Sequence, residues 1–319
     1  LLMAAALGGN EETFSYLWDH ISHDTINKRK ETLLMAALGG GNKNIAEKIK
    51  ESDENIFVSL DQFDWDDAFR QQCEVLSYAD DEFTEYYIEN EKPDLDETEY
   101  LCTSITDNGN IAALKIIKKN KNTKEYFNSS EFLNNILQFC FSSSQVRTIL
   151  EDIPNDIKKE LTYSLAKILS EESQMPNEDS EEIVQAFYNA GVPLDNYKGV
   201  RLPIYEAASV GDTAAVRKLA ELGADLDDKG KIGATAMLPA ARGDEDTLEV
   251  LLKYGANPNE SENKTGLTPL MIAVSWESPE CVRTLLDYGA DKDAIKKDGT
   301  TVYEYAQNTG NEEIITMLN

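Results

Sequence analysis

The chain has 319 residues, with 59 Asp and Glu against 30 Lys and Arg, and a formal net charge of −29. Such a charge argues against direct binding of nucleic acid or of anionic lipid, because both depend on clustered positive charge. The hydrophobic fraction of 41% is too high for a disordered acidic tail, and no run approaches the roughly 18 apolar residues of a membrane span. The composition therefore predicts a soluble, folded protein without a membrane-inserted segment.

The first 60 residues contain a repeated segment. The run Leu-Leu-Met-Ala at residues 1–4 and the run Gly-Gly-Asn at residues 8–10 recur at residues 33–36 and 40–42. This predicts two helical repeats in residues 1–60. Because the chain begins inside the first motif, we expect further residues upstream of Leu1.

The next segment is strongly acidic. Residues 51–100 carry 18 acidic and 2 basic side chains, interleaved with aromatic residues. A solvated acidic face is the more common use of such a run, and a docking site near residues 61–99 for a basic protein is the alternative. The candidate acidic patch consists of Asp61, Asp64, Asp66, Asp67, Asp80, Asp81, Glu82 and Glu85.

Residues 61–198 show weaker periodicity that still predicts pairs of helices. The expected pairs are 65–76 with 82–89, 99–106 with 111–118, 132–141 with 145–150, and 161–169 with 181–189. A polar inserted loop is expected at 170–180. A cluster of lysines at the end of one helix suits the negative end of the helix dipole, with an anionic partner contact as the alternative. The cluster is Lys115, Lys118, Lys119, Lys121 and Lys124.

The period becomes regular in residues 199–319. Ala207, Ala240 and Ala273 are spaced by 33 residues, and each lies in a short helical stretch. A leucine-rich amphipathic stretch follows each of them and ends at Gly223, Gly255 or Gly289. Self-similarity of this length indicates a stack of helical repeats. The alanines allow close helix packing, and the glycines suit a left-handed helix end.

These motifs resemble the ankyrin repeat. The best match runs through Gly266-Leu267-Thr268-Pro269-Leu270 to Ala273 and ends with Leu285-Leu286 and Gly289-Ala290-Asp291. The resemblance implies an all-α, ankyrin-type α-solenoid of helix-turn-helix repeats linked by β-turn or hairpin loops. It implies a single array of about ten repeats over residues 1–319: two in 1–60, diverged repeats in 61–198 and four recognisable ones in 199–319.

Two features depart from that family's pattern. Pro239 is expected about one turn inside the first helix of its repeat, where proline is costly. The family's histidine is replaced in the last four repeats by Tyr205, Leu238, Met271 and Glu304. The polar network that this histidine supports is therefore expected to be absent or altered.

The residue patterns of the sequence predict no catalytic, cofactor-binding or metal-binding residue. The sequence therefore predicts a protein that is not an enzyme. His20 and His23 are the only histidines, too few for a persuasive metal site. The cysteines are Cys73, Cys102, Cys140 and Cys281, whose scattered positions predict free thiols in a reducing compartment. We expect a monomer in the cytoplasm, or in a host cytosol if the protein is a translocated effector.

The resemblance implies a protein-binding surface on the first helices and hairpin tips. Trp276 and Tyr305 are the expected anchors, because aromatic residues on a solvent face contribute strongly to binding, with local packing of both rings as the alternative. The first-helix positions are Glu206, Ser209, Val210, Arg242, Ile272, Ser275, Trp276, Tyr305 and Asn308. The tip positions are Asp228, Lys229, Asn263, Lys264, Lys296 and Lys297.

The sequence thus predicts a non-enzymatic scaffold that binds a protein partner. Two alternatives stay open. The chain could instead be a regulatory ankyrin module of a larger protein, such as a channel or a modifying enzyme, which the start inside a repeat favours. It could also be an acidic decoy that mimics nucleic acid and binds a basic protein.

Overall fold

The computed structural model describes residues 92–107, 109–140, 142–170, 179–195 and 202–319, together with the single positions 12, 14, 15, 45, 48, 84, 85, 88 and 89. The chain divides into two compact units, residues 1–149 and 150–319. The predicted array of about ten repeats stays a prediction.

The described part of the first unit is built from helix pairs. Helix α7 (Leu95–Asp107) packs on α8 (Ile111–Lys119) and on α9 (Ser130–Leu137), which follows a 3-10 turn η2 (Tyr126–Asn128) and precedes α10 (Ser143–Leu150). The rings of Phe127 and Phe132 meet edge to face at 5.1 Å in the core. For three of the four helix pairs expected in residues 61–198, the structure describes residues of both helices. Two of these three pairs lie in this unit, and α7 begins four residues earlier than expected.

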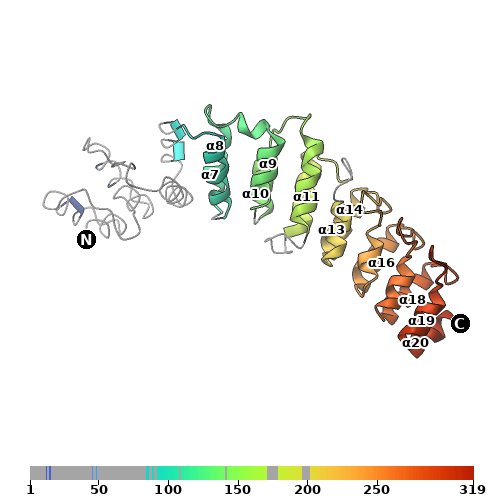
Figure 1. The fold of residues 1–319 in the computed structure, drawn as a ribbon. Coiled ribbons are helices and arrows are strands. Elements are labelled where there is room, and N and C mark those ends of the chain that lie inside the picture. The colour runs from blue at the N-terminus through green and yellow to red at the C-terminus, as the bar shows by residue number, and fades with distance from the viewer. Residues whose placement is uncertain are drawn as a thin grey trace, which may run out of the picture. The chain divides into compact units, whose positions relative to one another are not determined.

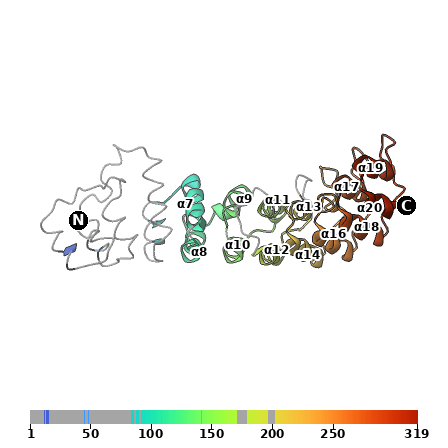
Figure 2. The ribbon, with the colours of Figure 1, turned by 90° about the horizontal axis from the view of Figure 1, so that it is seen from below.

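The second unit continues the series of helix pairs. The first helix of each pair has an odd number and the second helix has an even number. After η3 (Lys158–Leu161) come α11 (Thr162–Ile168), α12 (Ser180–Asn189), α13 (Pro203–Ser209), α14 (Thr213–Glu221), α15 (Met237–Ala240), α16 (Glu245–Lys253), α17 (Pro269–Ser275), α18 (Pro279–Asp287), α19 (Val302–Thr309) and α20 (Glu312–Leu318). The first helices α11, α13, α15, α17 and α19 pack one on the next, and so do the second helices (Figures 1 and 2).

This arrangement confirms the predicted all-α solenoid. Over the residues that the structure describes there is no strand, and only an isolated β-bridge joins Ile295 to Thr301. None of the described helices is long and apolar enough to cross a membrane.

The repeat motif acts as its residues predict. Thr268 precedes α17, and its hydroxyl accepts a hydrogen bond from the backbone N–H of Met271 at 3.3 Å. Pro269 occupies the first helical position, where its missing N–H has no helical partner to lose. Ala207, Ala240 and Ala273 are fully buried, so their small side chains permit the close approach of neighbouring helices.

Pro239 lies in a first helix that is shorter than its equivalent in the next repeat. Aligned with α17, Pro239 falls at the fourth helical position, whose N–H would make the first intrahelical hydrogen bond. Helix α15 has only four residues against seven in α17. The hydroxyl of Thr235, which corresponds to the capping Thr268, is buried and has no hydrogen-bond partner. The proline has therefore shortened the helix and displaced its cap.

The turns after the second helices are linked from repeat to repeat by acidic and amide side chains. Asp195 accepts a hydrogen bond from the N–H of Asp225 at 2.7 Å, and Asp227 accepts one from the N–H of Asn257 at 3.0 Å. Asn259 accepts one from the N–H of Asp291 at 2.7 Å. These contacts form a ladder that fixes each turn on the next.

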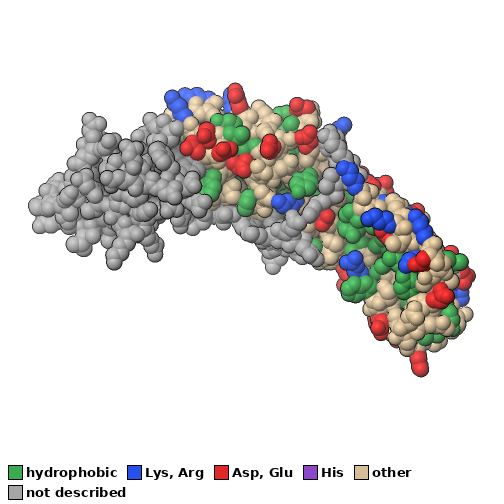
Figure 3. Space-filling view, viewed as in Figure 1, with side chains coloured by type: hydrophobic (Ala, Val, Ile, Leu, Met, Phe, Trp, Pro, Cys, Tyr) green, Lys and Arg blue, Asp and Glu red, His purple; other side chains and the backbone are tan. Residues whose placement is uncertain are grey.

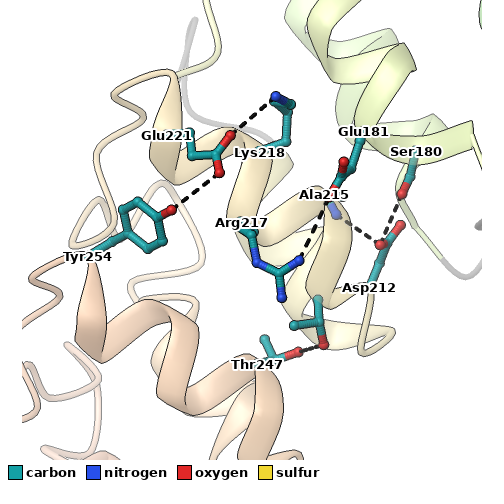
Figure 4. Close-up of polar contacts among 10 residues, drawn as sticks. Ser180, Glu181, Asp212, Ala215, Arg217, Lys218, Glu221, Thr247 and Tyr254 are labelled. Carbon is teal, nitrogen blue, oxygen red and sulfur yellow. Dashed lines mark hydrogen bonds and ion pairs between the residues drawn. The ribbon is translucent and has the colours of Figure 1, made fainter.

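The second helices are also joined by polar contacts (Figure 4). Ser180 donates to Asp212 at 3.0 Å, the hydroxyls of Thr213 and Thr247 are 2.7 Å apart, and the Tyr254 hydroxyl donates to Glu221 at 3.3 Å. These links fasten α12, α14 and α16 side by side.

Candidate functional site

The predicted partner-facing residues come from the first helices α13 to α19 and from the loops that precede α15, α17 and α19. Consecutive first helices are in contact, so their corresponding positions form a row along the unit. The site is therefore assembled from positions that lie about one repeat apart in the sequence.

Trp276 is the most exposed aromatic side chain of the described residues, with 59% of its surface accessible. It caps the C-terminus of α17, and the next residue, Glu277, has a left-handed φ of 54° that turns the chain into α18. The guanidinium of Arg242 lies 5.8 Å from the centre of the Trp276 ring. A cation–π contact of this kind is worth about 0.5–1 kcal/mol at an exposed site, so the ring is held against the neighbouring repeat.

Tyr305 is placed differently. Its side chain is half-buried on α19, and the ammonium of Lys296 lies 6.0 Å from its ring centre. Lys296 also forms an ion pair with Asp298 at 2.7 Å. Hydrogen bonds from Lys296 and Thr300 lower the pKa of Asp298 to about 2, and the bond to Asp298 raises the pKa of Lys296. Tyr305 thus belongs to a local cluster with the hairpin tip.

The remaining first-helix positions form a mixed polar and apolar strip. Glu206, Val210 and Ile272 are half-buried, whereas Ser275 is exposed and its hydroxyl donates to the carbonyl of Ile272 at 2.9 Å. Arg242 is exposed beside them. The strip offers contact area around Trp276 without a cluster of buried charge.

The hairpin tips are tied to one another by backbone hydrogen bonds. The N–H of Asn263 donates to the carbonyl of Gly233 at 2.8 Å, and the N–H of Lys297 donates to the carbonyl of Thr265 at 2.9 Å. Asn263 and Lys264 are exposed at their tip. The tips therefore present their side chains from a connected backbone.

Two exposed isoleucines in the loops that carry these tips were not among the predicted residues. Ile295 is 63% exposed and Ile232 is 43% exposed. Each stands directly beside a lysine in an otherwise polar loop, and that isolated apolar residue was the signal available. Both add apolar surface to the tip side of the unit.

Several predicted residues lie outside the described part of the chain. In the acidic patch only Glu85 is described, as an exposed helical residue, and Asp61, Asp64, Asp66, Asp67, Asp80, Asp81 and Glu82 are not. His20, His23 and Cys73 are also outside it. The acidic patch therefore stays a prediction.

The chemistry of the described residues gives no reactive cluster. Over these residues no group of three or more His, Cys, Asp or Glu side chains is placed to hold a metal ion. Cys102, Cys140 and Cys281 are buried, and none of the three is in a disulfide, as predicted. Burial raises the pKa of the Cys281 thiol, which keeps it protonated at neutral pH.

The comparisons with known proteins agree with this architecture. Residues 237–319 match the sequence model described as ankyrin repeats in three copies. These residues are ankyrin repeats. The match begins at α15 and includes Arg242, Trp276, Tyr305 and the two tips before α17 and α19.

Curated ankyrin-repeat and other proteins resemble parts of the chain. The E3 ubiquitin-protein ligase KEG of Arabidopsis thaliana is 30% identical over 106 residues, which cover 33% of this chain and 6% of the ligase. Ankyrin repeat and SOCS box protein 6 of Mus musculus is 32% identical over 114 residues, 34% of this chain and 27% of that protein. Protein phosphatase 1 regulatory subunit 27 of Mus musculus is 42% identical over 57 residues, 18% of this chain and 36% of that protein. The chain spans well under two thirds of the length of each of these relatives.

Proposed function

We propose that the chain is a non-enzymatic scaffold that binds a protein partner on the first helices and hairpin tips of its C-terminal ankyrin repeats. The observation that carries the proposal is the placement of Trp276, which is 59% exposed and held against Arg242 of the preceding repeat. An indole left on the surface at a fixed position supports a role in binding, because its burial by a partner releases a large apolar area.

The surroundings of Trp276 suit a protein partner. Binding energy at interfaces concentrates in a few aromatic and arginine residues surrounded by weaker contacts that exclude water. Trp276 and Arg242 are a pair of this type, the half-buried Ile272 lies one turn before Trp276 on α17, and the half-buried Val210 caps the end of α13. Ankyrin repeats generally bind proteins by such surfaces, since each repeat touches only its neighbours and the stack exposes a long face.

Tyr305 has a secondary part in this proposal. Its ring is half-buried and lies under Lys296, so a partner would gain less area from it than from Trp276. The tip residues Asn263, Lys264 and Lys296 would make polar contacts at the rim. We therefore rank Trp276 as the main anchor and Tyr305 as a support.

The test compares single variants of the full chain. Trp276→Ala should weaken the complex with a purified partner by at least about tenfold, measured by isothermal titration calorimetry. The matched control is Tyr188→Ala, which removes another exposed aromatic ring, on the second helix α12. Partners come from capture with the wild-type chain followed by quantitative mass spectrometry. Equal affinities of the wild type and Trp276→Ala for every purified partner would contradict the site.

A second candidate, a regulatory ankyrin module of a larger protein, is favoured by the relatives. One of them is named as a ubiquitin ligase and another as a regulatory subunit of a phosphatase, and the matched segment covers only 6% of the ligase. The complete open reading frame distinguishes this case, because it would place an additional domain next to the repeats. The acidic decoy stays a prediction for residues 51–100, and loss of binding to a basic protein at high salt would support it.

A further inference from the structure

Three lysines occupy the same position in the three hairpin tips of residues 228–301. They are Lys231, Lys264 and Lys297, spaced by 33 residues, and all three are exposed. We call them the lysine column. Lys198 continues the 33-residue spacing, in a part of the chain outside the described residues. In the space-filling view, Lys and Arg side chains recur along the C-terminal repeats (Figure 3).

Neighbouring lysines in the same loops form ion pairs with acidic side chains, whereas the lysines of the column do not. Lys229 pairs with Glu260 at 2.7 Å, and Lys296 pairs with Asp298 at 2.7 Å. No ion pair within the described part of the chain involves Lys231 or Lys264. Lys297 donates to the backbone carbonyl of Asn263, which leaves its charge without an acidic partner. These three charges are without an acidic partner among the described residues, in a chain that has 59 acidic and 30 basic residues.

The backbone holds the column in a repeating position. Gly233 and Gly266, each two residues after a column lysine, have left-handed φ values of 79° and 76° that close the tips. The hydrogen bonds from Asn263 to Gly233 and from Lys297 to Thr265 then join each tip to the next. Successive lysines are thus carried by connected loops rather than by independent ones.

We propose that the lysine column binds an extended acidic segment of a partner protein, with carboxylates at every third residue. Helices in direct contact lie about 8–10 Å apart, and the first helices beneath the tips are in direct contact, so we take this spacing for the corresponding backbone positions of successive tips. A polyproline II segment advances roughly 9 Å in three residues, so its every third side chain meets the next lysine. The inference rests on the proposed function, because it names the chemistry of one part of the same partner surface.

The charge of the surroundings favours a peptide over longer polyanions. Glu260, Glu262 and Asp298 lie in the same loops as the column, so the positive potential is confined to a narrow row. Nucleic acid and anionic membranes present dense negative charge that would also meet these carboxylates. A peptide with spaced carboxylates avoids repulsion by these acidic side chains, because its negative charges lie only opposite the lysines of the column.

The experiment uses a defined probe with the full chain. The probe is a fluorescein-labelled peptide of four Glu-Pro-Ser units, and the comparison peptide has the same composition with its four glutamates contiguous. Binding is measured by fluorescence anisotropy at about 50 mM salt, where exposed charge pairs are only weakly screened. The wild type should bind the spaced peptide more tightly than the contiguous one.

Two triple variants separate the column from net charge. In the first, Lys231, Lys264 and Lys297 are changed to Glu. In the control, Lys218, Lys253 and Arg283 on the second helices are changed to Glu, so both variants carry −35. Circular dichroism verifies that each variant is folded. The column variant should bind the spaced peptide at least about tenfold more weakly than the control variant.

Three results would overturn the inference. They are equal binding of the spaced peptide by the two variants, absence of any preference for the spaced peptide in the wild type, and tighter column-dependent binding of single-stranded DNA or of phosphatidylserine vesicles. None of these results affects the Trp276 test, which reads affinity for a purified partner. Column-dependent peptide binding with no effect of Trp276→Ala on any partner would instead contradict the proposed function alone.

Discussion

The hydroxyl of Ser180 donates a hydrogen bond to the carboxylate of Asp212, which lies one repeat later and is only 5% exposed. The same carboxylate oxygen accepts the N–H of Ala215 at 2.9 Å and caps helix α14. One side chain thus caps the start of the second helix of its own repeat and holds the start of the preceding second helix. The stack depends on such shared residues, because each repeat is stabilised mainly by its neighbours.

The first prediction concerns that residue. Asp212→Ala should lower the free energy of unfolding by about 2–3 kcal/mol, since it removes the cap of α14 and the buried hydrogen bond that the Ser180 hydroxyl donates to Asp212. Asp212→Asn keeps an acceptor oxygen and should lose less than half as much. Urea denaturation followed by circular dichroism measures both. A loss of stability no larger for Asp212→Ala than for Asp212→Asn would contradict the shared role.

The second prediction concerns Pro239 and its shortened helix. Pro239→Ala restores an N–H at the fourth helical position, so α15 should lengthen towards the seven residues of α17 and the unit should gain about 1 kcal/mol. Pro269→Ala is the matched control, because Pro269 lies at the first helical position and its replacement should slightly destabilise the unit. Midpoints of urea unfolding compare the two variants. Destabilisation by Pro239→Ala would show that the proline contributes more through packing than it loses in the backbone.

Most of the C-terminal fold could be predicted from the sequence, because every repeat needs similar residues to start its helices and to pack them closely. Thr268, Pro269 and Ala273 have the local roles that their residue types imply, and α17 begins at Pro269. The start of α7 was less predictable. It begins at Leu95 with a reciprocal pair of hydrogen bonds between Asp94 and Glu97, a capping signal that the acidic composition of the segment concealed.

The candidate site could be predicted only in part. The repeat period assigned Trp276 and Tyr305 to the first helices of their repeats. It could not predict what fraction of each side chain is exposed. That difference depends on neighbours one repeat away: Arg242 lies beside an exposed Trp276, whereas Lys296 covers a half-buried Tyr305. The contacts of a side chain across repeats follow from loop conformation, which a single sequence does not encode in a simple pattern.

The third prediction follows from the ladder of turns. Burial raises the pKa of Asp227, which accepts the N–H of Asn257, so the folded protein takes up a proton there at a higher pH than the unfolded chain. Stability from this residue is therefore greatest below its unfolded pKa and falls as pH rises through the folded pKa. Asp227→Asn keeps the acceptor and removes the buried charge, as Asn259 does naturally in the next turn. It should raise the thermal midpoint at pH 7.

The pH dependence separates this effect from general charge reduction. The gain from Asp227→Asn should shrink as pH falls towards the unfolded pKa of an aspartate, roughly 3.9, because the wild-type carboxyl then becomes neutral as well. Asp293→Asn is the control, since Asp293 is the exposed residue at the same position of the last turn. An equal rise in thermal midpoint for both variants at pH 7 would attribute the gain to lower net charge alone.

The fourth prediction concerns Lys118, one of the five clustered lysines. Its ammonium donates to the carbonyls of Thr148 at 2.8 Å and Ile149 at 2.9 Å, at the C-terminal end of α10. The cation therefore complements the dipole of a neighbouring helix rather than only that of its own helix α8. Lys118→Met keeps most of the apolar stem and removes the charge, so it should destabilise the protein by about 1–2 kcal/mol.

Lys115 provides the comparison, because it lies on α8 one turn earlier and is exposed. Lys115→Met should change the free energy of unfolding by less than about 0.5 kcal/mol. Hydrogen exchange locates the effect: amides in the last turn of α10 should exchange faster in Lys118→Met and at the wild-type rate in Lys115→Met. Similar exchange in the two variants would mean that Lys118 acts as a solvated member of the cluster, and the cluster would then be available as a whole to an anionic partner.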